Sequence, residues 1–269
     1  MAPILLHLLP ASFYLALAAA GPRLGRARHP ASRHVVAGLL CAALILHGFV
    51  LAQDMFEAGG FRFGLSIAMS LSLWLAMLVY GIESVVNPLR PLLTYAAPIA
   101  ALFALLPAIV PGHPQVIEAP NWAFRLHIAV AMAAYSLFTL AVFHALLMAA
   151  AERRLHSATL FDTGDLPPLL SLERILFRLI TTAFVFLTLT VGSGVLFSDQ
   201  IFGKPFGFSH KAVFGVASWV LFGILLTGRT VHGWRGKTAT RWLLAGFICL
   251  VLAYAGTRFV LEFLLQRSA

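Results

Sequence analysis

Apolar residues in this chain gather into eight long runs that are separated by short polar stretches. Most of the runs have about 18 to 25 residues, the length that an α-helix needs to cross about 30 Å of hydrocarbon. The runs cover residues 3–20, 35–52, 63–83, 92–110, 122–151, 175–197, 211–229 and 241–265. The pattern predicts an all-α fold, a polytopic membrane helix bundle of about eight transmembrane helices that forms one integral membrane domain over residues 1–269.

Composition agrees with a chain that lies in the lipid bilayer. Hydrophobic residues make up 60% of the chain and charged residues only 11%, whereas soluble domains carry about a quarter of charged residues. The formal net charge of +9 does not indicate a nucleic-acid partner, because the basic residues fall in the short loops between apolar runs. Such a distribution is typical of a topology signal.

Alternate loops differ in their basic residues, and this difference predicts the orientation. Thirteen of the 19 lysines and arginines fall in one set of loops, which the positive-inside rule makes cytoplasmic. We therefore expect a multi-pass protein of the bacterial inner membrane with both termini periplasmic. The outer loops are then residues 53–62, 111–121 and 198–210, and the longest inner loop is 152–174. All are too short for a soluble catalytic domain, so no enzymatic activity is expected.

Histidines gather toward the outer side of this predicted bundle. His127 and His210 stand at the outer starts of two apolar runs, and His47 lies in the outer half of the second run. Haem iron takes axial nitrogen ligands while the macrocycle prefers apolar walls, so His127 and His210 are candidate ligands of a haem iron, with His47 as an alternative. The competing interpretation is that each histidine only forms hydrogen bonds at the membrane interface.

Some other residues could bind the haem propionates, and others are not expected to belong to this candidate site. The outer cations Arg125, Lys211 and Arg258 could pair with the two haem propionates. His144 lies about 25 Å beyond His127 along the same helix, so the two cannot share a metal, and we expect His144 to bond another helix. The cysteines Cys41 and Cys249 lie in apolar runs without a CxxC pair, so neither thiol redox chemistry nor a zinc site is expected.

A series of residues from the seventh run onward resembles a known family. These residues are Ser209-His210-Lys211, Phe214, Ser218-Trp219, Gly228-Arg229, Gly233-Trp234-Arg235-Gly236, Ala239, Gly246 and Tyr254-Ala255-Gly256. They are similar to the C-terminal part of the cytochrome c assembly proteins of the CcsA, ResC and CcmC type, and Leu126-His127 with Ala134-Tyr135 resembles the histidine-bearing helix start of that family. The resemblance covers about residues 65–262 and is strongest to a YpjD- or HemX-like branch of eight-helix relatives.

The resemblance implies haem binding at the periplasmic face, with His127 matching an external haem ligand, and a role in cytochrome c biogenesis or haem delivery beside other membrane proteins of that assembly. Three positions depart from the family pattern. Residues 203–208 replace a tryptophan-rich motif, Thr227 stands where the family has a histidine, and His210 stands where it has an aspartate.

Two other functions remain open at this point. A membrane scaffold or regulatory protein without haem is favoured by the absence of the tryptophan-rich motif. A small-solute or ion transporter is the third possibility, although no helix break recurs in both halves of the sequence and few carboxylates lie at membrane depth.

Overall fold

Eight α-helices make up nearly all of the computed structural model over the residues that it describes, which are 2–26, 30–56, 60–86, 89–111, 115–117, 121–156, 168–197 and 210–256. The helices are α1 Ala2–Arg26, α2 Pro30–Met55, α3 Leu65–Val86, α4 Arg90–Ile109, α5 Trp122–His156, α6 Leu169–Leu196, α8 His210–His232 and α9 Gly236–Val251, and a π-helix, η2 Leu252–Gly256, follows α9. The predicted all-α bundle is confirmed.

Seven of the described helices are long and apolar enough to cross a membrane, and in α1 the apolar part, Ile4–Ala20, is shorter. Many of their large apolar side chains point outward, such as Leu5 at 63% exposure, Ile45 at 71% and Leu102 at 58%. Outward apolar side chains are what a helix surface in contact with lipid requires. The chain is therefore a multi-pass membrane protein.

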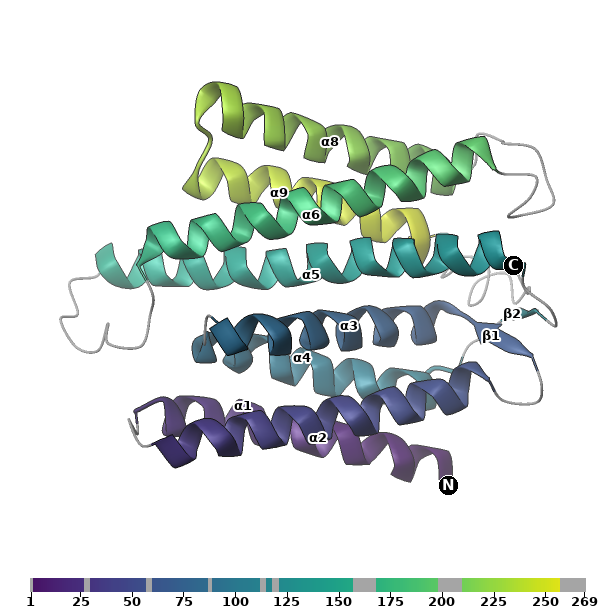
Figure 1. Ribbon diagram of the computed structural model, residues 1–269, viewed down its shortest axis with the longest axis vertical. Helices are drawn as coiled ribbons and strands as arrows, with labels where there is room; N and C mark the ends of the chain where they lie inside the picture. The colour runs from purple at the N-terminus through teal and green to yellow at the C-terminus, as the bar shows by residue number, and fades with distance from the viewer. Residues whose placement is uncertain are drawn as a thin grey trace.

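The helices form two groups that meet along α3 and α5 (Figure 1). In the first group α1 packs against α2 and α4, and α3 packs against α2 and α4; in the second, α5 packs against α6 and α9, and α8 against α6 and α9. One apolar core runs through both groups. Phe138 of α5 stacks on Phe222 of α8 at 3.8 Å between ring centroids, and a Cβ at Gly246 of α9 would lie only 2.8 Å from the Phe222 ring. Gly246 thus lets two helices approach closely, as expected for small residues in membrane bundles.

Two short strands pair at one end of the bundle, which was predicted to carry only loops. β1 Phe61–Phe63 and β2 Gln115–Ile117 are antiparallel, with Phe61 opposite Ile117. The pairing satisfies backbone groups of two loops that are far apart in sequence. We call this end of the bundle the β1–β2 end. The first residues of α1, α5 and α8 also lie there, at the right in Figure 1.

The helix bounds differ from the predicted runs mainly where polar residues continue a helix. α9 begins at Gly236 rather than at 241, and α6 begins at Leu169 rather than at 175. Hydropathy marks only the apolar part of a helix, whereas the backbone stays helical through the charged turns that face the interface.

Candidate functional site

His127 lies near the start of α5 and is held by a side chain of α6. Its imidazole is only 8% exposed, and its Nδ1 is 2.8 Å from the hydroxyl oxygen of Ser193. When that hydroxyl donates to the Thr190 carbonyl, 3.1 Å away, it accepts from His127, and Nδ1 carries the imidazole proton. Nε2 then carries a lone pair, which is the form of a histidine that ligates a metal and is oriented by an oxygen behind it.

The sequence held a signal for Ser193 that the prediction did not use. Gly192 and Gly194 are small residues of the kind that mark close helix contacts in membrane bundles, and Ser193 carries the hydroxyl between them. The contact is present, because a Cβ at Gly194 would lie 3.6 Å from His127 Cε1. A small polar residue within a glycine pair of an apolar helix can thus indicate the partner of a buried imidazole.

A tyrosine of the π-helix η2 contacts α5, α8 and the residue that precedes α3. Tyr254 lies with its hydroxyl 3.4 Å from the Gly64 carbonyl, its ring centroid 6.4 Å from that of Tyr135, and the Lys211 ammonium 6.0 Å from its ring centroid. Lys211 is also near enough to His127 to act on its charge. Segments of π-helix are frequent at functional sites, and here one brings an aromatic ring between α3, α5 and α8.

The other predicted haem residues lie in different surroundings. His210 is the exposed first residue of α8, and α8 begins at the same end of the bundle as α5, which carries His127 near its start (Figure 1). Arg125 is exposed two residues before His127, and this spacing rotates it by about 200° to another face of α5. Arg258 lies outside the described residues.

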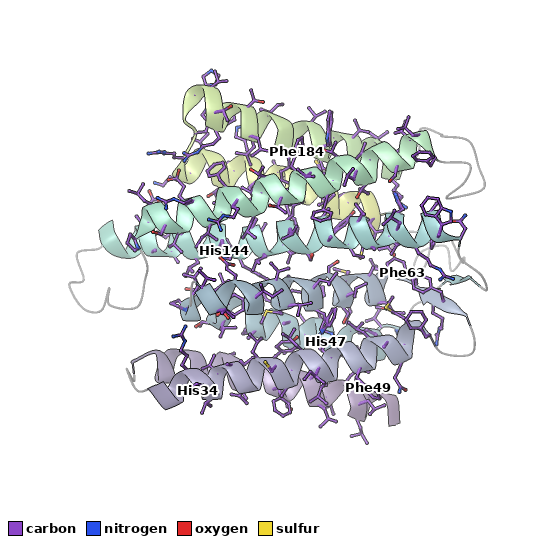
Figure 2. All side chains as sticks on the ribbon, in the orientation of Figure 1. His34, His47, Phe49, Phe63, His144 and Phe184 are labelled. Carbon is purple, nitrogen blue, oxygen red and sulfur yellow. The ribbon has the colours of Figure 1, made fainter. Side chains whose placement is uncertain are left out.

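His47 lies in the first helix group, away from α5 (Figure 2). It is 1% exposed, with Nδ1 3.2 Å from the Tyr14 hydroxyl and Nε2 2.9 Å from the Ser70 hydroxyl. Both ring nitrogens therefore take part in hydrogen bonds that join α1, α2 and α3.

His7 forms a second polar contact within the first helix group. Its Nδ1 donates to the Ala104 carbonyl at 2.7 Å, and its Nε2 is 3.3 Å from an Asp54 carboxylate oxygen. Because His7 is 3% exposed, these partners replace the water that a buried imidazole loses. They hold α1 against α2 and α4.

His144 lies deep between the two helix groups (Figure 2). It is fully buried, its Nδ1 donates to the Leu140 carbonyl of its own helix at 2.9 Å, and its Nε2 is 3.4 Å from a carboxylate oxygen of Glu83 in α3. His144 thus contacts another helix, and its polar partner there is a carboxylate at membrane depth.

The glycine- and tryptophan-containing residues after α8 form the turn into α9. The Trp234 amide donates to the Gly228 carbonyl at 3.2 Å, and a Cβ at Gly228 would lie 2.3 Å from the Trp234 ring. Gly233 and Gly236 have φ values of 66° and 50°, which glycine adopts without strain. Only glycine fits these positions comfortably.

A buried carboxylate fixes this turn to α6. Glu173 is 8% exposed and forms ion pairs with Arg229 and Arg235, and the Arg229 guanidinium lies 4.5 Å from the ring centroid of Phe177. The turn is therefore a structural element at the end of the bundle opposite His127. Glu173 was not singled out from the sequence, because a single carboxylate at a helix start carries no signal of its partners.

Comparison with known proteins agrees with these motif positions. A family model described as cytochrome C assembly protein matches residues 32–265. The chain belongs to the cytochrome c assembly protein family. The matched region begins within α2 and contains His127, Ser193, Lys211, Tyr254 and the whole α8–α9 turn. The resemblance predicted from the C-terminal motifs is confirmed.

Individual members of the family cover different shares of the chain. The inner membrane protein YpjD of Escherichia coli K12 is 32% identical over 135 residues. These residues are 50% of this chain and 51% of YpjD, so the chain spans about half the length of the YpjD relatives that it matches. A 28.8 kDa protein of Azospirillum brasilense, of no described function, is 33% identical over 215 residues, 77% of this chain and 79% of its own. The cytochrome c biogenesis protein CcsA of Cyanophora paradoxa is 29% identical over 85 residues, 32% of this chain and 26% of its own.

Proposed function

We propose that this chain is a protein of the bacterial inner membrane that holds haem at the β1–β2 end of its bundle and assists cytochrome c assembly or haem delivery, without an enzymatic activity of its own. The observation that carries the proposal is the imidazole of His127. Ser193 holds its Nδ1 as a donor, so Nε2 offers the lone pair that haem iron takes as an axial ligand.

The surroundings of His127 fit a haem. Tyr135, about two turns further along α5, pairs with Tyr254 and supplies aromatic surface. The Lys211 ammonium is a cation within electrostatic range of the imidazole that can pair with a propionate. The names of relatives add support, since YpjD is described as an inner membrane protein and CcsA as a cytochrome c biogenesis protein. When bound, haem would supply an iron centre for ligand exchange with a partner, and the chain would supply binding and orientation.

His210 is the proposed second axial ligand, because it is exposed at the same end and adjoins Lys211 in the sequence. Arg125 and Arg258 stay proposed propionate partners. His47 stays the alternative ligand, and it would have to give up a hydrogen bond to Tyr14 or Ser70 first. The β1–β2 end would face the periplasm, as the distribution of basic residues predicts.

The absorption spectrum of the purified full chain, expressed with excess haem precursor, tests this function. We expect a haem spectrum that is shifted or lost in His127→Ala and in His210→Ala while the protein stays folded. His144→Ala should leave the spectrum unchanged, because its imidazole contacts Glu83 about 25 Å from His127 along α5. A wild-type protein that takes up no haem would contradict the proposal and favour a scaffold.

A further inference from the structure

An apolar cavity of about 770 Å³ lies at the β1–β2 end, between α3 and α5. Its volume is within the range of about 300 to 1,000 Å³ that small-molecule sites occupy. The walls come from the end of α2, from β1, and from the facing sides of α3 and α5; they include Met55, Phe61, Leu71, Ile128, Met132 and Arg125.

This cavity is separate from the proposed haem ligand. It is lined by Arg125, Ile128, Ala129 and Met132 of α5, positions that lie between about 100° and 200° around the helix from His127. His127 itself turns to Ser193 of α6. One face of α5 therefore contacts α6, and another face of α5 lines the cavity.

The lining selects a long, flexible apolar chain. Met55 of α2 and Met132 of α5 line the cavity together with leucine, isoleucine and phenylalanine side chains. Methionine side chains adapt to irregular apolar shapes, which suits an alkyl chain with many conformations. Arg125 is the charged residue of this lining, and its guanidinium prefers planar or tetrahedral oxyanions such as phosphate.

The surroundings of the cavity set the depth of this arginine in the membrane. Trp122 begins α5 at 76% exposure, one turn before Arg125, and Phe56, which also lines the cavity, is 64% exposed. Exposed tryptophans at the ends of apolar helices mark the level of the lipid headgroups. Arg125 is thus at headgroup level, while the rest of the cavity continues along α3 and α5 toward the hydrocarbon.

We infer that this cavity binds an anionic phospholipid of the surrounding bilayer, with the headgroup phosphate on Arg125 and an acyl chain between α3 and α5. The inference goes beyond the proposed haem function, and the two proposals share one residue, since Arg125 is also a proposed propionate partner. Ala129 lines the cavity and has no part in the haem proposal, so a variant at Ala129 separates the two. The two helix groups meet along α3 and α5, and the cavity lies between these helices at the β1–β2 end. A bound lipid would therefore contact both groups there.

Native mass spectrometry of the delipidated full chain in detergent, titrated with dioleoyl phosphatidylglycerol or dioleoyl phosphatidylcholine, tests the inference. Since a charge-assisted hydrogen bond is lost with the guanidinium, Arg125→Gln should weaken phosphatidylglycerol binding about tenfold or more. Arg62→Gln is the matched control: it removes a cation of β1 at the same end, from a residue that does not line the cavity.

A second pair of variants tests the cavity without changing charge. Ala129→Phe should lower phosphatidylglycerol binding because it fills the cavity, whereas Ala245→Phe, at an exposed alanine of α9, should not. Equal binding of both lipids, equal effects of the two arginine variants, or tighter binding of oleate than of phosphatidylglycerol would overturn the inference. The haem absorption spectrum of the same samples tests the haem proposal, whereas lipid binding in the mass spectrometer tests the lipid proposal. A failure of one proposal can thus be distinguished from a failure of the other.

Discussion

At the scale of single residues, the role of each buried imidazole depends on its partners. His127 has a serine that fixes the proton on Nδ1, His47 has hydroxyls on both ring nitrogens, and His144 has a carboxylate on Nε2 and a carbonyl on Nδ1. All three stand on apolar helices, where an unpaired polar group is costly. Of the three, His127 has a hydroxyl at Nδ1 that itself donates to a backbone carbonyl, an arrangement that places the lone pair on Nε2.

Ser193→Ala tests this assignment at the level of one hydroxyl. Without the Ser193 oxygen the His127 ring loses its fixed tautomer and orientation, and we expect haem affinity to fall by about 10- to 100-fold, as for other partners behind a metal ligand. Haem content after purification and haem titration of the apoprotein measure this. Thr181→Ala is the matched control, because its exposed hydroxyl bonds only the Phe177 carbonyl of the same helix. Unchanged affinity in Ser193→Ala would remove Ser193 from the site.

At the scale of elements, the α8–α9 turn shows how one motif determines a helix connection. Gly228 leaves room for the Trp234 ring, Trp234 stacks on Trp242 at 5.4 Å between centroids, and Glu173 forms ion pairs with the two arginines beside them. These contacts fix where α9 begins and how it packs on α8. The family motif in this region is therefore explained by packing, at the end of the bundle opposite the proposed site.

Gly228→Ala should destabilise the bundle, because its new methyl group would overlap the packed Trp234 ring. Overpacking of this kind costs about 1–3 kcal/mol. Thermal unfolding of the purified protein in detergent measures the loss as a lower midpoint temperature. Gly215→Ala lies on the same helix and meets no atom within 4 Å, so it should leave the midpoint unchanged. Equal midpoints for the two variants would show that the turn relaxes around the added methyl group.

At the scale of the whole molecule, both proposed sites lie at one end of a bundle made of two helix groups. α5 takes part in both sites, since its His127 face meets α6 and its Arg125 face meets α3. The contact between the groups also holds the Glu83–His144 pair. The direction of this bundle in the membrane decides which compartment meets the β1–β2 end.

Reporter fusions test the direction. Thirteen of 19 basic residues fall in the stretches that the sequence predicts to be cytoplasmic, so we expect a reporter after Asp162 to behave as cytoplasmic and one after His113 to behave as periplasmic. Alkaline phosphatase, which is active only in the periplasm, should therefore be inactive at the first position and active at the second. The reverse pattern would place His127 and His210 on the cytoplasmic side and contradict haem delivery to the periplasm.

The sequence alone determined the class of the protein, its helices and the family. Membrane helices can be read locally, because each must be apolar over its own length, and the runs around His127 and His210 carried both the candidate ligands and the motifs. The tertiary structure decided the partners: Ser193 lies 66 residues from His127, Glu83 belongs to another helix than His144, and β1 pairs with β2 across two helices. Such pairings depend on how helices pack, and packing between apolar surfaces in lipid leaves no periodic signal in the sequence because interior and lipid-facing residues are equally apolar.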